Sequence, residues 1–99
     1  MLQYTENEIQ DKNDTLFKKH LKLISKRGYD INLLIKVVDM LATGIQLPEK
    51  YRDHSLTGNW KNYRECHIKP DWLLIYKYEQ DVLVLTLSAT GTHSDLFGR

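Results

Sequence analysis

The amino-acid sequence predicts an α+β domain in which a helical hairpin packs on an antiparallel sheet. In the first half of the chain, apolar residues recur at three- and four-residue spacing, which is the pattern of amphipathic helices. In the second half, they gather in β-branched and aromatic stretches separated by very short connections, which is the pattern of a β-meander. The 99 residues are 41% hydrophobic and 27% charged, so they suit a single domain over residues 1–99 and exclude a disordered chain.

The N-terminal half predicts one strand and two helices. Residues 2–5, LQYT, can form an edge strand. The apolar stripe in residues 16–24 predicts a first helix, which Gly28 should end because glycine adopts the left-handed conformation without a Cβ clash. Asp30 can cap a second helix by accepting hydrogen bonds from its first N–H groups. The core face of that helix is expected to hold Ile31, Leu34, Val37, Val38 and Leu41.

The C-terminal half predicts an antiparallel meander after a loop at residues 47–59. Its strands are expected at residues 60–68, 72–78 and 82–89. The two helices should cover one face of this sheet and leave the other face free for function. Alternation along the first strand directs three side chains to one face: Tyr63, Glu65 and His67.

The predicted strand ends carry ionisable side chains. His67 lies near the end of the first strand, Asp71 begins the second, and His93 follows the third. Thr92 can cap a single terminal turn, with Asp95 completing a capping-box-like pair. If the meander forms, the side chains at these strand ends can converge on one side of the sheet.

Imidazole and carboxylate groups are suited to proton transfer, because an imidazole titrates near pH ~6.5 and can accept or donate a proton. His54 adds a third imidazole in the second half. Taken singly, a histidine at a strand end is more often structural, and an aspartate after a proline is more often a turn residue. The histidines lack a short metal-ligand spacing and Cys66 has no second cysteine beside it, so we expect no metal and no cofactor.

Charge and hydropathy narrow the class of protein further. The net charge is only +1, but basic residues outnumber acidic ones in segments 12–27 and 50–77. Each segment suits either a solvated surface or an RNA contact. We find neither a signal-peptide pattern nor an apolar run long enough to span a membrane, so we expect a cytoplasmic protein with no membrane partner.

The segments YRDHSLTGNWKNYRECHIKPDWLLIYK and GTHSDLFG resemble the YafQ toxins, a branch of the RelE superfamily of bacterial type II toxin–antitoxin systems. The resemblance covers residues 51–98, and the N-terminal half agrees with it in layout. It implies a RelE-like fold and a metal-independent endoribonuclease, an mRNA interferase that enters the ribosomal A site and inhibits translation. It also implies a cognate antitoxin as partner, with DNA contacted only through the antitoxin complex.

The resemblance also implies which residues form the site. The family's catalytic positions fall on His54, His67, Asp71 and His93. We expect His93 to be the general acid, Asp71 or His67 to be the base, and His54 to orient the phosphate or the base. The residues expected to bind RNA are Lys61, Arg64, Trp72, Lys77 and Phe97, with the two aromatic rings stacking on an unpaired base.

One position departs from the wider superfamily, in which many members place an arginine late in the last strand, near the phosphate. Here that segment reads TLSATGTH, with Ala89 and no cation. Lys61, Arg64 or Lys77 are candidates to stabilise the developing charge instead.

Two readings from other classes remain open. The chain could be a noncatalytic RNA- or ribosome-binding module in which the histidines are incidental. It could also act mainly as a transcriptional corepressor paired with its antitoxin on DNA.

Overall fold

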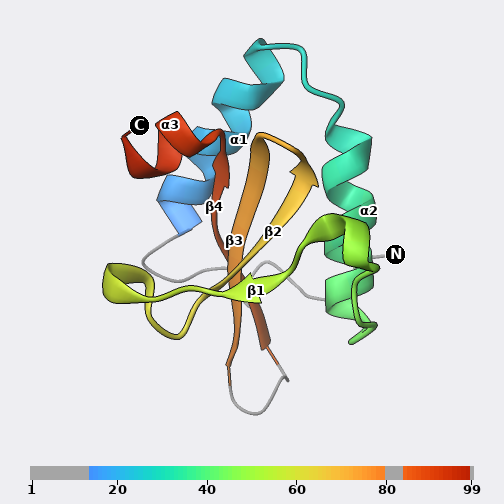
Figure 1. The fold of residues 1–99 in the computed structure, drawn as a ribbon. Coiled ribbons are helices and arrows are strands. Elements are labelled where there is room, and N and C mark those ends of the chain that lie inside the picture. The colour runs from blue at the N-terminus through green and yellow to red at the C-terminus, as the bar shows by residue number, and fades with distance from the viewer. Residues whose placement is uncertain (1–13, 80–83, 99) are drawn as a thin grey trace.

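The computed structural model describes residues 14–79 and 84–98 and contains two main helices and a four-stranded sheet (Figure 1). The elements in chain order are α1 (Asp14–Lys26), α2 (Ile31–Ala42), the 3-10 turn η1 (Glu49–Tyr51), β1 (His54–Ser55), the 3-10 turn η2 (Gly58–Trp60), β2 (Arg64–Lys69), β3 (Trp72–Glu79), β4 (Val84–Gly91) and α3 (His93–Phe97). The strands lie in the order β1-β2-β3-β4, and every neighbouring pair is antiparallel. The predicted α+β class and helical hairpin are confirmed.

The turn between α1 and α2 forms as its residues predict. Gly28 has φ +83°, its N–H donates to the carbonyl of Ser25, and the N–H of Tyr29 donates to the carbonyl of Ile24. These bonds satisfy the last carbonyls of α1 in a Schellman arrangement. Asp30 then caps α2, because its Oδ1 accepts from the N–H of Asn32 at 3.0 Å.

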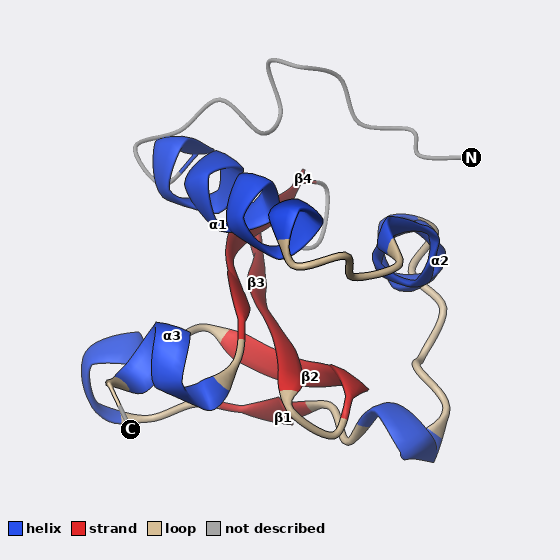
Figure 2. Ribbon diagram, turned by 90° about the horizontal axis from the view of Figure 1, so that it is seen from above, coloured by secondary structure: helices blue, strands red, loops and turns tan. Residues whose placement is uncertain are grey.

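The hydrophobic core lies between the helices and one face of the sheet. α1 packs on β4 and α2 packs on β2, so the two helices cover different strands of the sheet (Figure 2). The helices contribute Phe17, Ile24, Leu34, Val37, Val38 and Leu41, and the sheet contributes Cys66, Trp72, Leu74, Tyr76, Leu85 and Leu87. Burial of apolar surface on this scale is the main force that holds the sheet to the hairpin.

The opposite face of the sheet is not bare, so the prediction of a free face is wrong over its central strand. Leu73 and Ile75 point to this side by strand alternation, and both are fully buried. α3 contacts β4, and Figure 2 shows α3 and α1 on opposite sides of β3 and β4. Because β3 is buried on this side as well, the accessible part of this face is limited to the end of the sheet near α3.

The largest differences from the predicted strand boundaries are at β1 and at the start of β2, while β4 extends to Gly91, two residues beyond its predicted end. The segment predicted as a loop at 47–59 contains β1, a pair of residues too short to show strand periodicity. The strand predicted from residue 60 begins at Arg64, because η2 and the left-handed Asn62 (φ +77°) precede it. The predicted edge strand at 2–5 lies outside the described residues. Within the described ranges, no helix is both long and apolar enough to cross a bilayer.

Candidate active site

The antiparallel register gathers the ionisable side chains at one end of the sheet. β2 pairs His67 with Leu73, and β3 pairs Leu73 with Gly91, two residues before His93. The ring centroids of His67 and His93 lie 6.0 Å apart, and those of His67 and His54 lie 6.2 Å apart. The three imidazoles therefore form a row contributed by β1, β2 and the start of α3.

Asp71 holds His93 from the turn that precedes β3. Its Oδ1 lies 2.9 Å from Nδ1 of His93 and accepts from the backbone N–H of His93 at 3.1 Å. Hydrogen bonds from the His93 ring and then from its backbone lower the pKa of the Asp71 carboxyl. Because Nδ1 donates to this carboxylate, Nε2 of His93 is the ring atom left to exchange a proton.

Glu65 is a site residue that the sequence did not single out. Its side chain is only 6% exposed, and its Oε1 lies 3.2 Å from Nε2 of His54 and 3.5 Å from Nε2 of His67. The only available signal was strand alternation, which puts Glu65 and His67 on one face. The sequence did not predict β1, the strand that places His54 opposite Glu65.

The other nitrogen of each of these two rings faces a backbone carbonyl. Nδ1 of His54 lies 2.8 Å from the oxygen of Arg52, and Nδ1 of His67 lies 3.2 Å from the oxygen of Pro70. A carbonyl only accepts, so the proton of each neutral ring belongs on Nδ1. Nε2 is then the proton-accepting atom, and a proton placed there would lie against the Glu65 carboxylate.

A cleft of about 420 Å³ opens beside this row, lined by Leu56, Glu65, His93 and Phe97. The Phe97 ring lies 6.2 Å from that of His93 and is partly exposed. Leu56 and Phe97 thus provide apolar walls beside one imidazole and one carboxylate. Such a cleft can take a planar base while its phosphate lies over the histidines.

α3 is fixed in place by a network at its N-terminus. Thr92 Oγ1 accepts from the N–H of Asp95 at 3.0 Å, and Asp95 Oδ2 accepts from the N–H of Thr92 at 2.9 Å, which forms the predicted capping box. The Arg27 guanidinium binds both oxygens of Asp95, at 2.6 and 2.9 Å. This pairing holds the pKa of the Asp95 carboxyl well below its usual range.

Two of the three cations predicted to bind RNA are engaged by other side chains. Arg64 pairs with Tyr76, further along the sheet, and it binds Asp53 at 3.2 Å and Ser55 at 2.9 Å. Lys77 lies over the ring of Tyr63, 4.7 Å from its centroid. Lys61 is exposed after η2. Ala89 is fully buried in β4, so no cation stands at that position of the last strand.

The prediction that Trp72 stacks on an RNA base is wrong, because only 2% of its surface is exposed. Its Nε1 donates to Thr90 Oγ1 at 3.0 Å, and its ring meets Tyr29 edge to face at 4.9 Å. Trp72 thus supports the core next to the site. Of the two aromatic rings predicted to contact RNA, Phe97 is the one that is partly exposed.

In the described part of the chain, no group of three or more His, Cys, Asp or Glu side chains is arranged to hold a metal ion. The imidazole and carboxylate groups at the cleft are suited to proton transfer, and the Phe97 ring beside them to contact with a planar group.

Comparison with known proteins identifies relatives of this chain. A family model for the YafQ toxins of bacterial type II toxin–antitoxin systems matches residues 9–98. The mRNA interferase toxin YafQ of Escherichia coli strain K12 is 43% identical over 83 residues, which span 83% of this chain and 88% of that protein. In the crystal structure of the E. coli DinJ-YafQ complex, the similar chain is 43% identical with a TM-score of 0.77, over 84% of this chain and 91% of that one.

A further similar structure is that of a metal-bound toxin from Helicobacter pylori. It is 49% identical, with a TM-score of 0.77, over 83% of this chain and 91% of that one. The family model matches nearly the whole chain, and these relatives are 43% and 49% identical to it. Together, these matches show the family. The chain belongs to the YafQ family of toxins of bacterial type II toxin–antitoxin systems.

Proposed function

We propose that this chain is an mRNA interferase that cuts messenger RNA by attack of a ribose 2′-OH on the adjacent phosphorus. The observation that carries the proposal is the pairing of His93 with Asp71 at 2.9 Å, with His67 across a ring-centroid distance of 6.0 Å. Two imidazoles at this separation can face the two ends of one phosphodiester. The E. coli relatives named mRNA interferase support the same activity.

His93 serves as the general acid. As an imidazolium, it donates through Nδ1 to Asp71 and presents the Nε2 proton to the departing 5′-oxygen. The Asp71 carboxylate is poorly suited to be the base, because its pKa is lowered and its Oδ1 is already bound twice by His93. We therefore assign Asp71 to hold and stabilise the His93 ring.

His67 serves as the base. Its Nε2 accepts the 2′-OH proton as the bond from O2′ to phosphorus forms and the bond from phosphorus to O5′ breaks. The products are a 2′,3′-cyclic phosphate and a free 5′-OH. The new imidazolium is stabilised by Glu65, whose Oε1 lies 3.5 Å away. Nε2 of His54 lies 3.2 Å from the same oxygen and, when that ring is protonated, binds it and orients Glu65.

The toxin alone does not fully align its substrate, and a second macromolecule is needed to hold the messenger in position. The histidine row is open to solvent at its two ends, since half of the side-chain surface of His54 and of His93 is exposed, whereas only 13% of His67 between them is exposed. We propose that the ribosomal A site presents the messenger in a fixed path, which reduces the ordering that the toxin itself must supply. An antitoxin that covers this open row would silence it, and a relative forms a DinJ-YafQ toxin–antitoxin complex.

The test maps messenger ends in translating extracts with the wild-type protein and with His93→Ala. Wild type should produce new ends ending in a cyclic phosphate, and the variant should lose them by about 10²-fold or more, since a positioned acid contributes roughly 10²–10⁴-fold. His93 is half exposed, so the variant should keep the wild-type unfolding transition.

Identical end maps for the two proteins would reject the mechanism. Growth inhibition that survived His93→Ala without cleavage would favour a noncatalytic ribosome-binding module. Repression of a promoter by the toxin–antitoxin pair, with no effect of the toxin on messengers, would favour the corepressor.

A further inference from the structure

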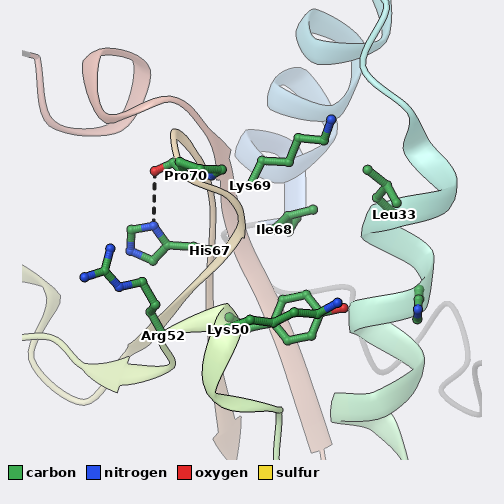
Figure 3. A pocket seen from close by; sticks show the side chains of 9 residues that line it. Leu33, Lys50, Arg52, His67, Ile68, Lys69 and Pro70 are labelled. Atoms are coloured by element: carbon green, nitrogen blue, oxygen red, sulfur yellow. Dashed lines mark hydrogen bonds between the residues drawn. The ribbon is translucent and has the colours of Figure 1, made fainter.

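A second and larger pocket lies on the far side of His67 from the cleft beside Phe97. Its volume is about 660 Å³, within the usual range of roughly 300–1,000 Å³ for ligand sites. It is bounded by α2, η1 and the end of β2, and Figure 3 shows side chains from all three elements around it. His67 forms one wall, so this pocket and the histidine row share a residue.

The pocket concentrates positive charge. Four of its nine lining residues are Lys or Arg and none is Asp or Glu: Lys36, Lys50, Arg52 and Lys69 are the cations. Within residues 14–79 and 84–98, none of the four forms an ion pair, although Lys50 lies over the Tyr51 ring at 5.1 Å. In a chain whose net charge is only +1, this is a local concentration of positive charge that would attract an anion.

The position of Arg52 connects the pocket to the reaction. Arg52 and His67 both line the pocket, and in Figure 3 the Arg52 side chain projects away from α2, on the side of the view where His67 lies. Arg52 also presents its carbonyl to Nδ1 of His54 at 2.8 Å, so its backbone is fixed relative to the histidine row. The cations thus extend from the proposed reacting groups outward along the pocket to Lys36 on α2.

We propose that this pocket binds the phosphate backbone of the messenger on one side of the cut. The inference rests on the proposed function, because a strand that is cut at the histidines must leave them in both directions. On one side the cleft beside Phe97 offers apolar walls to a base, and on the other side this pocket offers cations to successive phosphates. Four cations with no acidic residue among the lining residues favour a polyanionic strand over a neutral ligand. The position of His67 in the pocket wall favours RNA over an acidic segment of a protein partner.

The test measures binding of a fluorescent 2′-O-methyl oligonucleotide over a range of salt concentrations. This probe keeps its phosphates but has no free 2′-OH, so it cannot be cut, and the measurement is independent of catalysis. The variant is the triple change Lys36→Gln, Lys50→Gln and Lys69→Gln. The matched control is Lys19→Gln, Lys22→Gln and Lys26→Gln, which removes the same charge from exposed positions on α1 that do not line the pocket.

Each phosphate contact to a single strand contributes about 0.7 to the slope of log K against log salt concentration. The pocket variant should therefore lower that slope by about 2, with roughly 100-fold weaker binding at about 0.1 M salt. The α1 control should change the slope by less than about 1, and both proteins should unfold at the wild-type denaturant midpoint.

Equal effects of the two variants, or no binding of the probe by wild type at low salt, would overturn the proposal. An oligoglutamate peptide of equal length tests the other occupant. If it binds more tightly than the oligonucleotide and loses its binding in the pocket variant, the site is one for an acidic protein and the proposal is overturned. The failure of messenger cleavage in extracts, with the slope difference intact, would instead reject the proposed function and leave the RNA site standing.

Discussion

At the residue scale, Glu65 determines how the histidines can work. A carboxylate with only 6% of its side chain exposed is costly to bury unless it is paired. Here the Nε2 atoms of two imidazoles approach the same oxygen at 3.2 and 3.5 Å, and each pairs with it when its ring is protonated. Glu65 touches His67 rather than the reacting phosphate in this arrangement, so it acts as a positioning residue for the base.

Glu65→Gln should therefore reduce the turnover of cleavage while leaving messenger binding nearly unchanged. A hydrogen bond to a charged group contributes about 1.5–3 kcal/mol, which corresponds to roughly 10- to 100-fold in rate. Single-turnover kinetics on programmed ribosomes would separate the two quantities. A raised KM with unchanged kcat would contradict the assignment, and Glu65→Asp, which keeps the charge, should recover part of the lost rate.

Trp72 provides the contrasting residue, because its role is structural. Trp72→Phe removes the bond from Nε1 to Thr90 and part of a buried ring, but it leaves the cleft residues in place. The free energy of unfolding should fall by about 1–3 kcal/mol. Urea unfolding would measure this loss. At a temperature where the variant is folded, its rate of messenger cleavage should stay within about twofold of wild type. A larger loss of cleavage with unchanged stability would indicate that Trp72 contacts RNA.

At the element scale, α3 carries two site residues although it is only five residues long. A helix this short does not hold itself, since isolated helices need roughly 12–15 residues. It is fixed by the Thr92 and Asp95 capping box and by the Arg27 guanidinium from the end of α1. Gly91 makes room for this network, because a Cβ there would lie 2.8 Å from Asp95 Oδ2.

Asp95→Ala should loosen α3 and displace His93. Loss of a cap and of a charge-assisted pair together should lower the free energy of unfolding by about 2 kcal/mol. The pKa of Asp95 is lowered in the fold, so its contribution is present above the ordinary value of 3.8 and is lost as the pH falls below it. Denaturant curves at neutral and acid pH would show a smaller pH dependence in the variant.

Arg27→Ala is the matched control for this prediction. It removes the ion pair but keeps the capping box, so its effect on stability and on cleavage should be the smaller of the two. An Arg27 variant that was the more damaging would show that the link to α1, rather than the cap, holds the helix.

At the scale of the whole molecule, the sequence predicts best where a pattern repeats. The helical hairpin, the meander and the α3 cap each rest on spacing or capping residues such as Gly28, Asp30 and Thr92, and all of them form. The chain's periodicity could not show β1, because two residues have no period. Without β1, the pairing of His54 with Glu65 could not be predicted. The cationic pocket could not be predicted either, because it joins residues from α2, η1 and β2 that are distant in the sequence.

The packing of α1 against β4 makes the stability of the whole chain sensitive to pH through His20. Its Nδ1 accepts from the N–H of Thr90 at 3.2 Å, which requires an unprotonated nitrogen, and burial lowers the pKa of the ring below its ordinary value of 6.5. Below that value the unfolded chain binds a proton that the folded chain does not, so stability falls as the pH falls, by up to about 1.4 kcal/mol per pH unit. His20→Asn keeps an acceptor near the same place and cannot titrate, so its stability should fall less steeply between pH 6.5 and the acid range. The other histidines are common to both proteins, so urea midpoints compared across that range isolate His20, and parallel curves would refute its role.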